Sequence, residues 1–309
     1  MRRVLLVLAI LPALLLGGFV AFDRLFPEAA ANLYIGMQRS RADLEPKSVA
    51  IPGFEIAYLE GGSGETLVLI HGSGADKGNW IPIARHLTPH YRVIALDLPG
   101  YGDSSKPDAA RYRIAEQLIR LDQFFDALKL DSVHLGGNSM GGFIAGAYAG
   151  THRQRVKSLW LLAPGGLRTA KESEVRRIYR ETGRSPLFPE KPEDFDRVLE
   201  FVFAKPPFIP HGIKTVLAAR AVRNFQLHSR IYSEIASDDL RLEYLLPSVT
   251  APTLVLWGDQ DRVLDVSGAE IVQQLLPSAK VVILTGVGHV PMIEAPAASA
   301  KALLDFQAR

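Results

Sequence analysis

The sequence has no cysteine and no excess of charge of either sign. Of its 309 residues, 35 are Lys or Arg and 33 are Asp or Glu, which gives a formal net charge of +2. Without cysteine, disulfides, thiolate nucleophiles and cysteine metal ligands are excluded, whereas the cellular compartment stays open. The basic residues are scattered and form no array with aromatic residues, which argues against a nucleic-acid-binding protein.

One long hydrophobic run is present at the N-terminus. From Val4 to Phe22 no side chain is charged or forms hydrogen bonds, and Arg2 and Arg3 precede the run. As a helix it would span about 28 Å, close to the roughly 30 Å of hydrocarbon in a bilayer. A cleaved signal usually has a shorter apolar region. The run therefore predicts an uncleaved transmembrane anchor over residues 1–24.

Small residues recur at every fourth position of this run, at Ala9, Ala13, Gly17 and Ala21. Such a face lets two helices approach closely, so it is a candidate homodimer contact, although small residues are common in any membrane helix. Arg2 and Arg3 favour a cytoplasmic N-terminus and a single-pass protein with its catalytic domain outward, although Arg24, Arg39 and Arg41 lie on the other side of the run. Residues 25–46 predict a juxtamembrane helix or linker.

From residue 47 onward, strand and helix patterns alternate, which is typical of an α/β fold with a mostly parallel sheet flanked by helices. Strands are expected at 48–51, 55–59, 66–70, 92–96, 133–136, 158–162, 253–256 and 281–284, and helices at 79–87, 114–128 and 296–307. Residues 167–249 show only helical periodicity, interrupted by prolines. They predict a helical cap between two core parts, 47–166 and 250–309, over the edge where such sheets bind ligands.

The segment Gly137-Asn138-Ser139-Met140-Gly141 fits the pattern G-x-S-x-G between an expected strand and a helix of small residues. Glycines on both sides leave room for a sharp, strained turn, which exposes the serine hydroxyl at the start of the helix. The pattern predicts Ser139 as the nucleophile of a serine hydrolase.

A serine hydroxyl needs a base to accept its proton and an acid to orient that base. His289 lies on a glycine-rich loop after the last expected strand, and this position favours it over the other seven histidines. For the acid, Asp259, Asp261 and Asp265 compete after strand 253–256. Asp261 is favoured, since Asp259 could orient the loop and Asp265 could be the N-cap of the next helix.

The turn His71-Gly72-Ser73-Gly74 follows the expected strand 66–70. In a hydrolase of this kind, a backbone N–H from this turn and one from the residue after the nucleophile stabilise the oxyanion. Ser73 and Met140 are the expected donors, and the chemistry requires no metal and no organic cofactor.

Four segments resemble those of α/β-hydrolases, in particular membrane-anchored monoacylglycerol lipases of the α/β-hydrolase-domain family and bacterial inner-membrane phospholipases A. They are Asn138 to Gly142, Ala163 to Leu167, Trp257 to Ala269, and Gly288 with His289. The resemblance implies an α/β-hydrolase fold with Ser139, Asp261 and His289 as the triad. It also implies a carboxylester hydrolase anchored in the bacterial inner membrane, which acts through an acyl-Ser139 intermediate on glycerolipids, whether monoacylglycerol, lysophospholipid or phospholipid.

Alternatives remain at the level of the substrate. Ser73 and Gly74 also resemble hydrolases that cleave carbon–carbon bonds of aromatic ring-fission products, and a non-lipid carboxylesterase would use the same triad. Epoxide hydrolases and haloalkane dehalogenases carry Asp at the elbow, so Ser139 argues against both. Apolar cap segments around Phe201 and Phe208 either bind acyl chains or pack the cap on the core.

Overall fold

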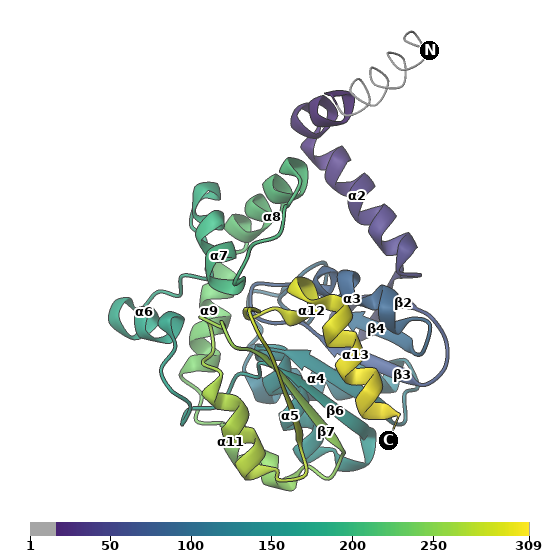
Figure 1. Cartoon of the computed structure of the whole chain (residues 1–309), viewed down its shortest axis with the longest axis vertical. Coiled ribbons are helices and arrows are strands. Elements are labelled where there is room, and N and C mark those ends of the chain that lie inside the picture. The colour runs from purple at the N-terminus through teal and green to yellow at the C-terminus, as the bar shows by residue number, and fades with distance from the viewer. Residues whose placement is uncertain (1–16, 309) are drawn as a thin grey trace.

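An eight-stranded sheet forms the centre of the protein in a computed structural model that describes residues 17–308 (Figure 1). Its strand order is β1-β2-β4-β3-β5-β6-β7-β8. β1 pairs antiparallel with β2, and β2 pairs antiparallel with β4. The other strand pairs, from β4-β3 to β7-β8, are parallel. The strands are β1 (Glu45–Ile51), β2 (Phe54–Gly61), β3 (Thr66–Ile70), β4 (Arg92–Leu96), β5 (Val133–Asn138), β6 (Val156–Leu162), β7 (Thr253–Gly258) and β8 (Lys280–Leu284). The predicted α/β class with a mostly parallel sheet is confirmed.

Helices cover both faces of the sheet. One face packs against α4 (Ile114–Ala127), α5 (Met140–Thr151) and α11 (Ser267–Leu275), and the other against α3 (Ile81–Leu87), α12 (Pro291–Glu294) and α13 (Pro296–Gln307). In β3, Val68 and Ile70 join the first core and Leu67 and Leu69 the second. A strand buried on both faces has to be apolar at every position, which explains its continuous hydrophobic run.

Several boundaries differ from the sequence prediction. The helix expected at 79–87 begins as a 3₁₀ turn, η1 (Lys77–Trp80), because the Asp76 side chain accepts the Gly78 N–H and Pro82 then starts α3. β1 begins at Glu45 rather than at residue 48, since it pairs with β2 along its whole length.

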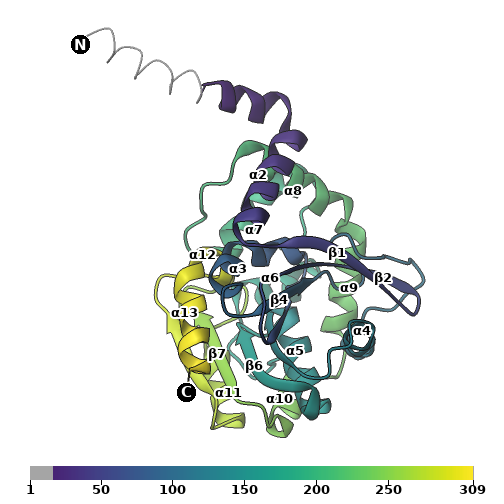
Figure 2. The same cartoon turned by 90° about the vertical axis from the view of Figure 1, so that its right-hand side faces the viewer.

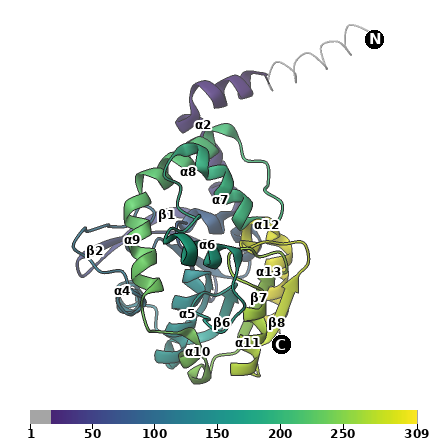
Figure 3. The same ribbon diagram turned by 90° about the vertical axis from the view of Figure 1, so that its left-hand side faces the viewer.

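A group of helices joins β6 to β7 and lies across the carboxyl ends of the strands (Figure 3). It comprises α6 (Glu174–Thr182), η3 (Pro192–Asp194), α7 (Phe195–Val202), α8 (His211–Arg223), α9 (Phe225–Ala236), α10 (Leu242–Leu245) and η4 (Leu246–Ser248). These helices lie within the stretch predicted as a cap. Phe201 and Phe203 are buried, whereas Phe208 on the α7–α8 connection is 92% exposed.

An N-terminal arm packs on the cap. Residues 17–25 are helical and lead into α2 (Pro27–Arg41), which lies beside α8 (Figure 2). Asp23 is buried at this contact, and its Oδ1 accepts the Gly212 N–H of the first turn of α8 at 2.9 Å. On α2 the buried residues are Ala30 and Ala31, whereas Leu33 and Met37 are exposed.

Between residues 17 and 308, no helix is both long enough and apolar enough to cross a membrane. Most of the run predicted as a transmembrane anchor, including Ala9 and Ala13, lies outside the described residues. Gly17 and Ala21 lie within them, and both are exposed.

Candidate active site

Ser139 occupies a sharp turn between β5 and α5. Its backbone has φ 57° and ψ −119°, a conformation that costs a non-glycine residue free energy and is typical of functional sites. A Cβ on Gly137 would lie 2.2 Å from the carbonyl oxygen of Gly141, and one on Gly141 would lie 2.2 Å from that of Ile70. Both glycines are therefore required by close backbone packing, as the G-x-S-x-G pattern implies.

His289 and Asp261 are in direct contact. The imidazole Nδ1 lies 2.7 Å from Oδ2 of Asp261, and the two side chains are 5% and 0% exposed. Since a carboxylate only accepts, Nδ1 carries the proton of this hydrogen bond, which leaves Nε2 as a proton acceptor. A base with this tautomer is what activation of a serine requires.

The Asp261 carboxylate is held by three further donors. Trp257 Nε1 donates to Oδ2 at 3.0 Å, and the N–H groups of Val263 and Leu264 donate to Oδ1 at 2.8 and 2.9 Å. This set of donors fixes the orientation of the carboxylate toward His289.

The two other candidate acids, Asp259 and Asp265, accept hydrogen bonds from other groups. Asp259 accepts the Gly286 N–H at 2.7 Å, and Asp265 accepts the Ser267 N–H at 2.9 Å at the start of α11, where Val266 holds the N-cap position. Among the three candidate acids, the structure brings Asp261 alone to His289.

Asn138 links the serine strand to the histidine loop. Its Nδ2 donates to the carbonyl oxygens of Leu162 at 3.1 Å and of His289 at 3.0 Å, and the side chain is buried. The residue before Ser139 thereby fixes the main chain of His289. From the sequence, Asn138 was predicted only as a position of the G-x-S-x-G motif; an amide at the end of a buried strand was the available signal.

The histidine loop is also tied to the cap. The His289 N–H donates to the carbonyl oxygen of Val202 at the end of α7, at 2.8 Å. Glu294 accepts the Gly288 N–H at 2.7 Å and the Lys205 N–H at 2.9 Å. The cap therefore takes part in the placement of the histidine.

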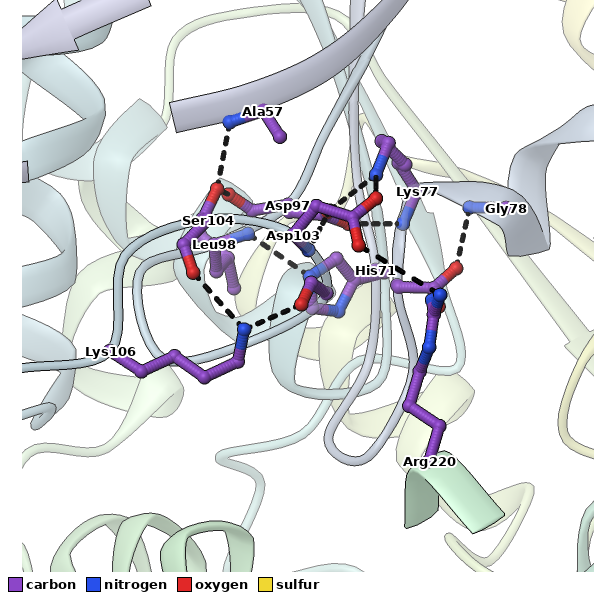
Figure 4. Close-up of polar contacts among 12 residues, drawn as sticks. Ala57, His71, Lys77, Gly78, Asp97, Leu98, Asp103, Ser104, Lys106 and Arg220 are labelled. Atoms are coloured by element: carbon purple, nitrogen blue, oxygen red, sulfur yellow. Dashed lines mark hydrogen bonds and ion pairs between the residues drawn. The ribbon is translucent and has the colours of Figure 1, made fainter. Parts of the chain in front are cut away.

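The turn that carries Ser73 lies against the serine. A Cβ on Gly72 would approach the Cβ of Ser139 to 3.1 Å. His71 is fully buried beneath this turn: its Nδ1–H donates to the Gly72 carbonyl at 2.8 Å, and its Nε2 accepts the Leu98 N–H at 3.1 Å (Figure 4). Burial lowers the pKa of His71, so the ring stays neutral and keeps both bonds.

A buried ion-pair network holds the segment that follows this turn (Figure 4). Asp97 is wholly buried and accepts the backbone N–H of Lys77 at 2.7 Å, the Lys77 ammonium at 2.6 Å and the Asp103 N–H at 2.7 Å. Burial alone would lower the pKa of Lys77, but the Asp97 and Asp103 carboxylates outweigh it and raise that pKa. From the cap, the Arg220 guanidinium pairs with Asp76 at 2.7 Å. None of these contacts was predicted from the sequence.

Residues 65–207 and 185–296 match the family profile described as alpha/beta hydrolase fold. The chain belongs to the α/β-hydrolase family. This α/β-hydrolase is 39% identical to Lipase 1 of Psychrobacter immobilis over 269 residues, which cover 84% of this chain and 83% of that protein. The predicted resemblance is confirmed.

The matches to two further proteins extend over a larger part of this chain. Monoacylglycerol lipase ABHD6 of Homo sapiens is 29% identical over 303 residues, which cover 94% of this chain and 90% of that protein. A solved structure titled a membrane phospholipase A, a bacterial virulence factor, is 44% identical with a TM-score of 0.89, and the match covers 100% of this chain and 98% of that one. No group of three His, Asp or Glu side chains within residues 17–308 is arranged to hold a metal ion.

Proposed function

We propose that this protein is a membrane-anchored carboxylester hydrolase that cleaves acyl esters of glycerolipids through an acyl-Ser139 intermediate. The observation that carries the proposal is the buried His289–Asp261 pair at 2.7 Å, whose histidine loop Asn138 ties to the strand of Ser139. Membership of the α/β-hydrolase family, together with lipases among the relatives, makes the chain a serine ester hydrolase of the lipase type.

The mechanism follows from the roles of the three side chains. Oγ of Ser139 attacks the ester carbonyl carbon while Nε2 of His289 takes its proton, and Asp261 stabilises the imidazolium. The oxyanion accepts the N–H groups of Ser73 and Met140, each typically worth about 3 kcal/mol of barrier. Collapse breaks the C–O bond, and His289 returns the proton to the leaving alcohol. Water then repeats the sequence on the acyl-enzyme, which releases the fatty acid and regenerates Ser139.

Lipid esters are the favoured substrates because of the N-terminus and the relatives. The uncharged run from Val4 to Phe22 would hold the enzyme at a bilayer, where such esters are concentrated. Exposed apolar side chains continue along the described part of the arm, at Leu25, Phe26, Leu33 and Met37. One relative is named a monoacylglycerol lipase and one structure is titled a membrane phospholipase A.

Fluorophosphonate labelling of the full chain tests the acyl-enzyme mechanism. The wild type should gain one covalent adduct, and peptide mass spectrometry should locate it on Ser139. Ser139→Ala should not react. A wild type that forms no adduct would overturn the proposal.

A substrate panel tests the ester class. It contains monoacylglycerols, lysophospholipids and phospholipids of graded chain length, short water-soluble esters and ring-fission dienoates. Turnover should be highest on the lipid esters. A preference for the short esters would reject the lipid substrate, and turnover of the dienoates alone would reject ester hydrolysis.

The membrane arm and the homodimer are tested separately. Deletion of residues 4–16 should release the enzyme from liposomes in a flotation assay, and retention would argue against an anchor. Gly17→Leu should weaken detergent-resistant cross-linking if Ala9, Ala13, Gly17 and Ala21 form a contact between two copies. Unchanged cross-linking would reject that face.

A further inference from the structure

The hydroxyl groups of Tyr101 and Ser73 both contact the sulfur of Met140. Ser73 and Met140 are the two expected oxyanion donors. The phenol donates to Sδ of Met140 at 3.5 Å, and the Ser73 hydroxyl donates to that sulfur at 3.3 Å. The Met140 sulfur thus joins the side chain of Met140 to those of Tyr101 and Ser73.

The ring of Tyr101 is firmly held. It lies on the loop after β4, is wholly buried, and packs edge-on against His71 with the ring centres 5.2 Å apart. The ring also stacks on His228 of α9, with the ring centres 4.7 Å apart and an angle of 28° between the planes. The ring is therefore held by a core histidine next to the oxyanion turn and by a histidine of the cap.

The phenol has an unusual partner for a buried donor. Buried hydroxyl groups normally find a strong acceptor, whereas a thioether sulfur is a weak one. Burial raises the pKa of Tyr101, so the oxygen keeps its proton and remains a donor. A requirement for stability alone does not explain why this donor points at the sulfur of Met140.

We propose that Tyr101 is a positioning residue of the oxyanion hole, acting through Met140 and Ser73. Ser73 follows β3 and Met140 begins α5, so a side-chain bridge adds a constraint between their N–H groups that neither element provides. Both groups have to lie about 2.7–3.1 Å from the developing charge. The inference rests on the proposed acyl-Ser139 mechanism.

Tyr101→Phe tests this role, because it keeps the ring packing and removes only the hydroxyl. We expect kcat to fall about tenfold, less than the 10²–10³-fold loss typical when a donor is removed outright. KM should stay within about twofold, and Ki of a trifluoromethyl ketone transition-state analogue should rise by the factor lost in kcat.

Two further variants separate positioning from packing. Tyr148 is equally buried and its hydroxyl donates to Asp122 at 2.6 Å, so Tyr148→Phe removes a comparable phenol and should leave kcat and Ki unchanged. Met140→Leu removes the sulfur and keeps the N–H, and it should reproduce the loss seen with Tyr101→Phe. The double variant should be no worse than either single variant, because both act on one bridge.

The outcomes are distinct. If the wild type is labelled at Ser139 and hydrolyses esters, but Tyr101→Phe matches it in kcat and Ki, this inference fails and the proposed function stands. A raised KM with unchanged kcat, or additive losses in the double variant, would also overturn the inference. A wild type that is never labelled would overturn both.

Discussion

Arg220 and Asp76 connect the cap to the loop that carries Ser73. Nη1 of Arg220, on α8, lies 2.7 Å from Oδ2 of Asp76, while Oδ1 of the same carboxylate accepts the Gly78 N–H at 2.8 Å. One carboxylate therefore holds a cap helix and shapes the turn that follows the proposed oxyanion donor. The two side chains are 40% and 16% exposed, so the pair is open to screening by salt.

Arg220→Gln should lower the free energy of unfolding modestly, and only at low salt. For a partly exposed pair we expect a loss of about 0.5–1 kcal/mol at 0.05 M NaCl, which should largely vanish near 1 M, where charges are screened within roughly 3 Å. Urea unfolding at both salt concentrations measures this loss in the free energy of unfolding. Arg184→Gln, which breaks an exposed pair with Glu190 inside the cap, should change little. A loss independent of salt would contradict the electrostatic origin.

Asp261→Asn should abolish most of the activity and leave the fold intact. An amide cannot accept from all four donors of this carboxylate and cannot stabilise the imidazolium, so kcat should fall by roughly 10⁴. Asp259→Asn is the matched control, because Asp259 only accepts the Gly286 N–H. It should retain activity within a few-fold. Equal losses in the two variants would show that the acid was assigned wrongly.

Asn138→Asp should slow the labelling of Ser139 more than Asn138→Ala does. The aspartate keeps the shape of the side chain but turns a carboxylate oxygen toward the carbonyl oxygens of Leu162 and His289. Alanine only leaves the His289 carbonyl without its donor, at a cost of about 1–3 kcal/mol in stability. Fluorophosphonate labelling rates and urea midpoints give the two readings. An aspartate variant as fast as the wild type would exclude a role of Asn138 in placing His289.

The stability of the protein should fall as the pH drops from about 6.5 to 4, in part through His228. Burial, then the neighbouring His71 and Lys106, lower the pKa of His228 to about 4. Since the unfolded chain binds this proton first, the contribution of neutral His228 is complete above pH 6.5 and is lost as the pH falls to about 4. The slope should reach about 1.4 kcal/mol per pH unit.

His228→Phe should remove this part of the slope while keeping an aromatic ring on Tyr101. The quantity to measure is the difference between the urea unfolding curves of wild type and variant from pH 4 to pH 7.5. Contributions from groups that do not interact with His228 are common to both proteins. A difference that stays constant over this range would contradict the buried neutral histidine.

Local pattern predicted the sheet and the elbow well. Val68 and Leu69 face opposite cores, so β3 had to be apolar throughout, and Gly137 and Gly141 are fixed by contacts that any such elbow makes. The acid loop was harder, because three aspartates lie within seven residues and only the path of the loop selects Asp261.

Contacts between distant parts of the chain were not predictable from pattern. Asn138 and His289 are 151 positions apart, and Arg220 and Asp76 are 144 apart. The helical periodicity of residues 167–249 predicted that the cap consists of helices, but it did not predict how those helices are oriented. The contact face of α2, expected only as a juxtamembrane helix or linker, was not predicted either: Ala30 and Ala31 are buried, because closely packed helices favour small side chains.

The contact between Asp23 and Gly212 bears on how the enzyme can be shortened for work in solution. A form that starts at the sheet, near Glu45, would take away the acceptor of an α8 N–H. It would also remove the Pro27 backbone, which packs so closely that a Cβ on Gly212 would lie 2.6 Å from its oxygen. The helix that carries Arg220 would lose its neighbour. The shortest self-sufficient version therefore keeps Asp23 and discards only what precedes it.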